Sequence, residues 1–473
     1  MCQPSPHLWN TCYRLLITFL FCVASSHAQG TTYVVLWFDT EDYIDPISDD
    51  AALRIANDLT AEGVRGTFKV VGEKARILER RGRRDVIEAL GRHCIGYHSN
   101  WHSIQPVPAV SVQHLGFLEG ADEFERRERS GFEDVGRIFG VTPVCYGQPG
   151  SSWAPQSNLA LRRMGIHVYL DEGTQLGYND QPVWYGGLLY VFNLGPYQLR
   201  ADLDDDTPLP ETFKQFDAAV SHFAGSSGGL ISTVYHPTEF VHTEFWDAVN
   251  FANGTVRERK EWVLPKRRSE KDAEHCFGIL KAYVEHAKSL HNVQFVTAAD
   301  LIHIYATPIP PVVDTATLAR HFKESISFLS MPSGDLSAAD ILLELLHVPA
   351  RYVDGPTATG ITTYEETTIP AFVFDSMLQD VRSFIETNHR LPNEVFVGSK
   401  TLSLVDFAAT LAQHLLAPGP VLVVHGKVGF ERCFSTDAQS AFKWPIHPEG
   451  FAPEELLQLA RLQGWTLKPA RLR

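Results

Sequence analysis

The sequence has few cysteines, no excess of positive charge and almost no long apolar run. Its seven cysteines among 473 residues form no Cys-x-x-Cys pair, which argues against a fold held together by a disulfide framework. The formal net charge of -15 argues against nucleic acid or an anionic membrane as a partner. Hydrophobic residues make up 44% and charged residues 21% of the chain, which is typical of a globular protein long enough for two domains.

The one marked apolar run lies at the N-terminus. Arg14 precedes an apolar stretch over residues 15–24, and small residues follow it. This pattern predicts a signal peptide over residues 1–29, and therefore export to the periplasm or the extracellular space, with no membrane span after cleavage. A retained membrane anchor is the alternative. Among the cysteines beyond this segment, Cys94 and Cys145 are candidates for a disulfide.

Strand-like and helix-like segments alternate after the N-terminal segment. Strands are predicted at 33–39, 66–72 and 93–99, for example, with helical segments at 52–63 and 75–91 between them. This alternation is typical of a parallel sheet. The number of predicted strands favours a distorted (β/α) barrel, an α/β fold in which reactive side chains gather where the strands end.

A proline-rich segment divides the chain. Residues 307–314 are predicted to form a linker, because closely spaced prolines continue neither a helix nor a central strand. We expect a catalytic domain over 30–306 that folds and acts alone, and a smaller, mainly helical accessory domain over 315–473. Within the latter, Ser337 and Ser403 each open a Ser-x-x-Asp pattern that predicts a capped helix start.

Three carboxylates follow the first predicted strand. Asp39, Glu41 and Asp42 are close enough in the chain to repel one another in an empty site. A divalent cation among them would relieve that repulsion. A solvated acidic loop is the alternative, because exposed acids are common.

Two histidines follow a later strand. His98 and His102 are four residues apart, a spacing that lets both rings face one point. Two neutral imidazoles and a carboxylate form a common hydrolytic metal set that leaves a position open for water, and zinc is the divalent metal we expect. With twenty histidines in the chain, a chance pair is the alternative.

In their order along the chain, these motifs resemble the polysaccharide deacetylase family over residues 31–305. YVVLWFDTED resembles the first motif of that family, GTFKVVG its second strand, and GYHSNWH its metal-binding H-[S/T]-x-x-H motif. The resemblance implies that Asp39 is the general base and that His98 and His102 are metal ligands. The third ligand is either Asp42 or Glu41.

Two later segments extend the resemblance and one departs from it. His236, at the end of ISTVYH, is similar to the family's late histidine, which implies a general acid. A structural histidine is the alternative. Gly147 stands where the family's Arg-x-Pro motif has its arginine, and Asp171 corresponds to the acid that pairs with that arginine. Asp171 is therefore a candidate site residue without its usual partner.

Aromatic residues cluster between residues 153 and 185. Trp153, Trp184 and Tyr185 are predicted to bind substrate, because the faces of sugar rings stack on such side chains. Burial of the same rings in the core is the alternative. Farther along, residues 381–413 resemble a pseudomurein-binding repeat, which implies attachment to a cell wall or a glycan.

These patterns predict a metal-dependent hydrolase of non-peptide carbon–nitrogen bonds. The leading hypothesis is N-deacetylation of an N-acetylated glycan or cell-wall polymer. One alternative is hydrolysis of a small ureide or amide, which a closed pocket would favour. The other is a catalytically silent glycan-binding wall protein, which predicts a broken metal set.

Overall fold

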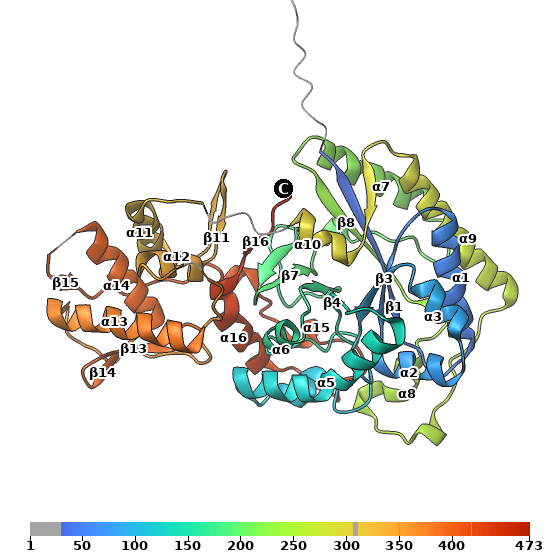
Figure 1. The fold of residues 1–473 in the computed structure, drawn as a ribbon, viewed down its shortest axis with the longest axis horizontal. Coiled ribbons are helices and arrows are strands. Elements are labelled where there is room, and N and C mark those ends of the chain that lie inside the picture. The colour runs from blue at the N-terminus through green and yellow to red at the C-terminus, as the bar shows by residue number, and fades with distance from the viewer. Residues whose placement is uncertain (1–29, 306–310, 350, 418) are drawn as a thin grey trace, which may run out of the picture.

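The computed structural model describes residues 30–305, 311–349, 351–417 and 419–473. The predicted signal peptide and residues 307–310 of the predicted linker lie outside the described residues. Figure 1 shows a large lobe built around a sheet and a smaller helical lobe beside it. Among the helices described, none is long and apolar enough to cross a membrane.

The large lobe contains a sheet that has ten strands within the described residues. They are β1 (Thr32–Thr40), β2 (Thr67–Val70), β3 (Cys94–Tyr97), β4 (Cys145–Tyr146), β5 (Val168–Leu170), β6 (Val183–Tyr185), β7 (Leu188–Val191), β8 (Gly229–Tyr235), β9 (Val293–Val296) and β16 (Lys468–Pro469). Their order is β16-β6-β7-β5-β4-β3-β2-β1-β8, and β9 also pairs with β1. Pairing is parallel except at β6–β7 and β16–β6.

The sheet curls into a distorted barrel. After β7 the chain returns to β8, where Gln198 forms a parallel bridge with Ser232 and the Leu199 amide donates to the Ser232 carbonyl at 3.0 Å. This short contact joins the segment after β7 to β8, although β7 and β8 are not neighbours in the strand order. The predicted α/β class and distorted (β/α) barrel are confirmed.

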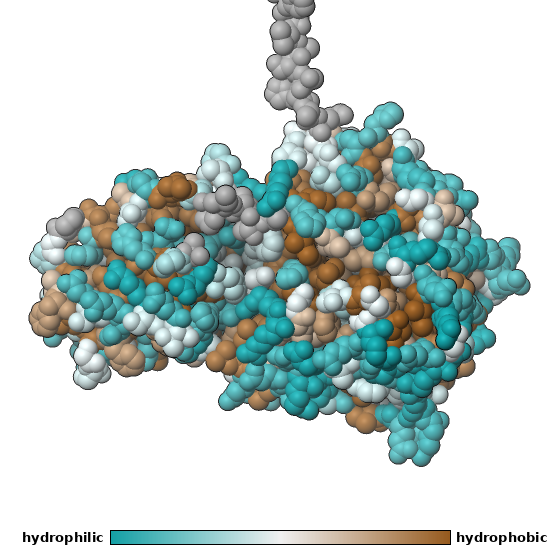
Figure 2. Space-filling view, viewed as in Figure 1, coloured by the Kyte–Doolittle hydropathy of each residue, from teal (hydrophilic) through white to brown (hydrophobic). Residues whose placement is uncertain are grey.

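Helices cover the outside of the curled sheet (Figure 1). The helices of the large lobe are α1 (Ile47–Ala61), α2 (Gly72–Arg80), α3 (Arg84–Leu90), α4 (Pro108–Val112), α5 (Phe117–Phe139), α6 (Ser157–Arg163), α7 (Leu209–Ala224), α8 (Trp246–Phe251), α9 (Glu270–Ser289) and α10 (Ala298–Ile304). The outer side of α5 carries many charged residues, and Figure 2 shows a hydrophilic surface over it. The opposite side of α5 is buried, as expected of an amphipathic helix.

Alternation along β1 directs its side chains to two different cores. Leu36 and Phe38 pack in the core that includes the outer helices, whereas Val35 and Trp37 pack in a second core with residues of β5, β7 and β8. Side chains two residues apart in a strand share a face, so Asp39 lies on the same inner side as Trp37. At the end of β1, the inner face of the strand therefore changes from apolar side chains to the Asp39 carboxylate.

The smaller lobe is mainly helical, as predicted. Its elements are α11 (Thr315–Glu324), β10 (Leu329–Met331), β11 (Gly334–Leu336), α12 (Ala338–Leu345), β12 (Thr368–Ile369), α13 (Ala371–Asn388), β13 (Glu394–Val397), β14 (Lys400–Ser403), α14 (Leu404–Leu416) and β15 (Val421–Leu422). Ser337 caps α12 by accepting from the Asp340 amide, and Ser403 caps α14 by accepting from the Asp406 amide. Both predicted caps are confirmed.

The last part of the chain returns to the large lobe. Beyond the helical lobe come α15 (Ala438–Ala441), α16 (Glu454–Leu462) and β16, which pairs antiparallel with β6. The Tyr185 hydroxyl donates to the Ala460 carbonyl at 3.0 Å, and the Gln175 side chain donates to the Ala441 carbonyl at 2.7 Å. The large lobe thus includes an edge strand and buried contacts from residues beyond the predicted division at residues 306 and 315. A chain of residues 30–306 alone would lack them.

The cysteines of the described part of the chain are all free thiols. Cys94 and Cys145 lie on neighbouring strands and are both buried, but they are not joined. The disulfide considered from the sequence is therefore absent from this structure.

Candidate functional site

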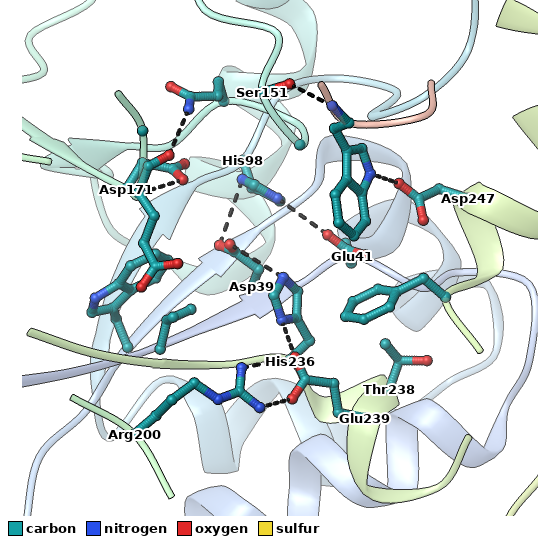
Figure 3. Close-up of a pocket in the computed structure, with 18 of the residues that line it drawn as sticks. Asp39, Glu41, His98, Ser151, Asp171, Arg200, His236, Thr238, Glu239 and Asp247 are labelled. Carbon is teal, nitrogen blue, oxygen red and sulfur yellow. Dashed lines mark hydrogen bonds and ion pairs between the residues drawn. The ribbon is translucent and has the colours of Figure 1, made fainter. Parts of the chain in front are cut away.

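A cavity of about 620 Å³ opens where the strands of the barrel end. Asp39 at the end of β1, His98 directly after β3 and His236 directly after β8 all line it. Figure 3 shows these side chains pointing toward one another. The predicted clusters, far apart in the sequence, are thus brought together.

Two imidazoles and one carboxylate converge at the base of the cavity. Glu41 Oε2 lies 3.3 Å from His98 Nε2 and 2.8 Å from His102 Nε2. All three side chains are at least 95% buried, and one ligand atom from each lies within 4.8 Å of the others. Although burial opposes ionisation, the charge of His102 beside it holds the pKa of Glu41 well below its usual value.

Hydrogen bonds orient both rings so that each Nε2 atom faces Glu41. His98 Nδ1 donates to the Gly147 carbonyl at 3.0 Å, which leaves the lone pair on Nε2. His102 Nδ1 lies 2.6 Å from Ser103 Oγ, whose hydroxyl is directed to Asp247 Oδ2 at 3.4 Å. The backbone at His102 is left-handed, with φ of 57°, and the centroids of the two imidazole rings lie 5.0 Å apart.

Glu41 and Asp42, the two alternatives for the third ligand, have different positions. Glu41 contacts both histidines, and its second oxygen accepts from the Trp246 indole at 3.1 Å. Asp42 is turned away, since its Oδ1 accepts from the backbone amides of Ile44 and Asp45. Glu41, and not Asp42, is therefore in position to complete a ligand set with the histidines.

A buried lysine separates two other acids. Lys69 Nζ lies 3.0 Å from both Asp39 Oδ1 and Asp171 Oδ2, and it donates to the Leu170 carbonyl at 2.7 Å. Lys69 is opposite Asp39 in the β1–β2 register, so both side chains point to the same side of the sheet. Asp39, Asp171 and His98 also lie close enough to hold a metal. Because the ammonium group already lies between these carboxylates, a second cation there would be repelled.

Lys69 also explains the glycine at position 147. A Cβ atom at this position would overlap Lys69 Nζ and Asp171 Oδ2. Lys69 of β2 thus supplies the cation beside Asp39. Its ammonium group fills the space that a side chain at position 147 would need. Asp171, predicted without a partner, pairs with this lysine.

The Gly147→Ala variant is expected to be less stable by about 2 kcal/mol or more, because displacing Lys69 would leave two buried carboxylates without their cation. Thermal unfolding measures the effect. Gly278→Ala in α9 is the matched control, since a Cβ there meets no atom within 4 Å. Equal melting temperatures for the two variants would show that Lys69 is not held as described.

A chain of ion pairs holds His236 beside Asp39. His236 Nε2 lies 3.6 Å from Asp39 Oδ2, and its Nδ1 lies 2.6 Å from Glu239 Oε1. Glu239 is itself paired with Arg200 through both of its oxygens. Burial lowers the pKa of His236, but the hydrogen bond and charge of Glu239 outweigh it and raise the pKa to about 9. His236 is therefore protonated at neutral pH.

The aromatic residues predicted to bind substrate lie outside the cavity. Trp153 and Tyr185 are fully buried, and each donates its polar hydrogen within the protein, to the Tyr190 hydroxyl and to the Ala460 carbonyl. Trp184 lies on β6 opposite Lys468 of β16. The three rings that were predicted to bind substrate therefore pack around the sheet and do not line this cavity. The aromatic side chains that do line the cavity are Trp37, Phe245 and Trp444.

Comparisons with known proteins concern the fold. No protein-family model matches the chain, and no curated protein matches it in sequence. A candidate polysaccharide deacetylase from Mycobacterium smegmatis has a similar structure, with a TM-score of 0.38 and 17% identity over 62% of this chain and 98% of the other. The peptidoglycan deacetylase PdaC from Bacillus subtilis gives a TM-score of 0.29 and 13% identity over 58% of this chain and 91% of the other.

A 4-alpha-glucanotransferase from Thermococcus litoralis is also similar, with a TM-score of 0.40 and 10% identity over 61% of this chain and 43% of that chain. These likenesses concern the fold alone.

Proposed function

We propose that the protein is a metal-dependent hydrolase of a non-peptide amide bond, most directly an N-deacetylase. The observation that carries this proposal is the convergence of Glu41, His98 and His102 at the base of an open cavity. His102 Nε2 is buried and has no hydrogen-bond partner among the described residues, although it lies 2.8 Å from Glu41 Oε2. A buried nitrogen that faces a carboxylate without forming a hydrogen bond is open to a ligand that binds both groups.

This donor set fits a divalent cation. Two imidazole nitrogens and one carboxylate oxygen are the protein ligands of several hydrolytic zinc sites. Ser103 and the Gly147 carbonyl hold the second nitrogen of each ring, as the outer partners of metal ligands do. When bound, the cation would supply Lewis acidity to the amide carbonyl.

Asp39 and His236 have the positions for proton transfer. Asp39, paired with Lys69, lies beside the ligand set and would accept the proton of the attacking water. His236, protonated through Glu239, would donate a proton to the leaving amine. Each such residue contributes about 10²–10⁴-fold in rate.

We propose an N-acetylated glycan as the substrate, because the cavity is open to solvent and aromatic side chains line part of its wall. The test measures acetate release by the full-length protein from oligomers of N-acetylglucosamine and from peptidoglycan, and hydrolytic ring opening of allantoin as a small ureide. Release from a glycan supports the proposal. Turnover of allantoin alone would favour the small-amide alternative, and turnover of none would favour a silent binding protein.

Export and wall attachment complete the proposal. The N-terminal pattern supports export, and the resemblance of residues 381–413 to a wall-binding repeat supports a role for the helical lobe in holding the enzyme on its polymer. Sedimentation of the protein with insoluble wall material tests this role. Equal sedimentation of the protein and of an unrelated acidic control would contradict it.

The Glu239→Gln variant is expected to lose activity at alkaline pH. A general acid must be protonated, so activity falls as pH rises through the pKa of His236. With Glu239 neutral, that pKa should fall from about 9 toward or below the ordinary value of about 6.5, moving the alkaline limb of kcat down by roughly two pH units. Glu244→Gln, a rim carboxylate of the same cavity, is the control. An unchanged limb in Glu239→Gln would remove His236 from the role of acid.

A further inference from the structure

A tryptophan from the C-terminal end lines the cavity. Trp444 follows α15 and lies beyond the whole helical lobe in the sequence, yet it borders the same space as His98 and His236. It is partly exposed. The C-terminal return described above therefore contributes to the cavity as well as to the sheet.

Contacts on several sides hold the Trp444 indole in place. Its backbone amide donates to Ser151 Oγ at 2.9 Å, and its indole Nε1 donates to Asp247 Oδ2 at 2.8 Å; Figure 3 shows both partners at the rim. Gly150 packs so closely that a Cβ atom would overlap the indole ring. Phe245 meets the ring edge to face, with centroids 5.5 Å apart.

The same contacts connect Trp444 to the candidate ligand set. Asp247, which accepts from the indole, also accepts from Ser103, and Ser103 lies 2.6 Å from His102 Nδ1. The ring is thus beside the reacting centre and not at a remote part of the surface. Because its N–H is already bound to Asp247, what the indole offers a ligand is an apolar, electron-rich face.

We propose that Trp444 is a specificity-determining residue, on whose indole face a pyranose ring of the substrate stacks next to the bond that is cleaved. This inference rests on the proposed deacetylase function. The C–H bonds on one face of a pyranose ring complement an aromatic face. The other large apolar side chains of the lining, Trp37, Leu203 and Val234, are at most 4% exposed, so the partly exposed Trp444 and Phe245 offer a sugar more apolar surface.

The test measures binding and turnover of an N-acetylglucosamine pentamer by the full-length protein. Trp444→Ala removes the ring, whereas Trp444→Phe keeps a smaller aromatic face and loses the N–H. We expect Trp444→Ala to raise KM and the calorimetric Kd at least about tenfold, with a smaller change in kcat, because loss of a stacking contact is worth about 1.4 kcal/mol or more. Trp444→Phe should stay within about threefold of the wild type. Trp184→Ala, a partly buried tryptophan outside the cavity, is the matched control.

The possible outcomes distinguish failure of the stacking role from failure of the proposed deacetylase function. If the wild type releases acetate and Trp444→Ala binds the pentamer as tightly as the wild type, the stacking role is wrong and the deacetylase function stands. If Trp444→Phe is as weak as Trp444→Ala, the Asp247 bond matters and the ring face does not. If the wild type neither binds nor hydrolyses any acetylated glycan, the proposed function fails, and this inference fails with it.

Discussion

The His102→Ala variant is expected to lose divalent metal together with all measurable amide hydrolysis, while it remains folded. His102 would supply one of three protein ligands, and loss of an outer partner alone already costs about 10–100-fold in metal affinity. A direct ligand should cost at least the upper value. Because the ring lies at the cavity floor after β3, its removal takes little from either apolar core. Elemental analysis after dialysis and thermal unfolding check both parts.

Matched variants test whether the loss of metal is specific to the proposed ligands. His242→Ala removes another buried histidine of the same cavity, one that contacts Thr238 and Asp45, and should keep the metal. Glu41→Gln should lose metal, whereas Asp42→Asn should retain it, because only Glu41 reaches the two histidines. Stoichiometric metal in His102→Ala, or the reverse order of the two acids, would overturn the ligand set.

The Asp39→Asn variant is expected to keep its metal and to lose about 10²–10⁴-fold in kcat. An amide fills the space of the carboxylate and can still accept a hydrogen bond from Lys69, but it cannot take a proton from water. The same preparation is measured for metal content and for acetate release across pH. The loss should appear in kcat more than in KM, since Asp39 acts on the reacting water.

Asp171→Asn provides the control for this variant. It removes the other acid on Lys69, so it perturbs the same ion pair without removing the proposed base. We expect a smaller loss of kcat than in Asp39→Asn. If Asp39→Asn empties the site, or if the two variants are equally impaired, Asp39 acts as a ligand or as part of the ion pair and not as the base.

The strand ends could be predicted from the sequence because the signal is local. A buried apolar strand followed by acids at 39–42, and another followed by the histidines, place polar groups at the same edge of a parallel sheet. The sequence could not choose between Glu41 and Asp42. That choice depends on backbone amides at residues 44 and 45, which capture the Asp42 carboxylate.

Lys69 has a signal in the sequence. It is a charged residue inside the apolar strand GTFKVVG, and a buried lysine requires a partner. Glu239 could also have been found, three residues after His236 in YHPTEF. Trp444 had no local signal. Its place in the cavity depends on a return of the chain after the helical lobe, which periodicity and motif spacing do not reveal.

The most direct test of the account is the metal content of the purified full-length protein together with its activity before and after chelation. We predict one divalent ion per chain, loss of acetate release from an N-acetylated glycan on chelation, and its recovery when zinc is restored. A protein that releases acetate at the same rate without any bound metal would contradict the role of Glu41, His98 and His102. So would a chain that binds no divalent ion at all.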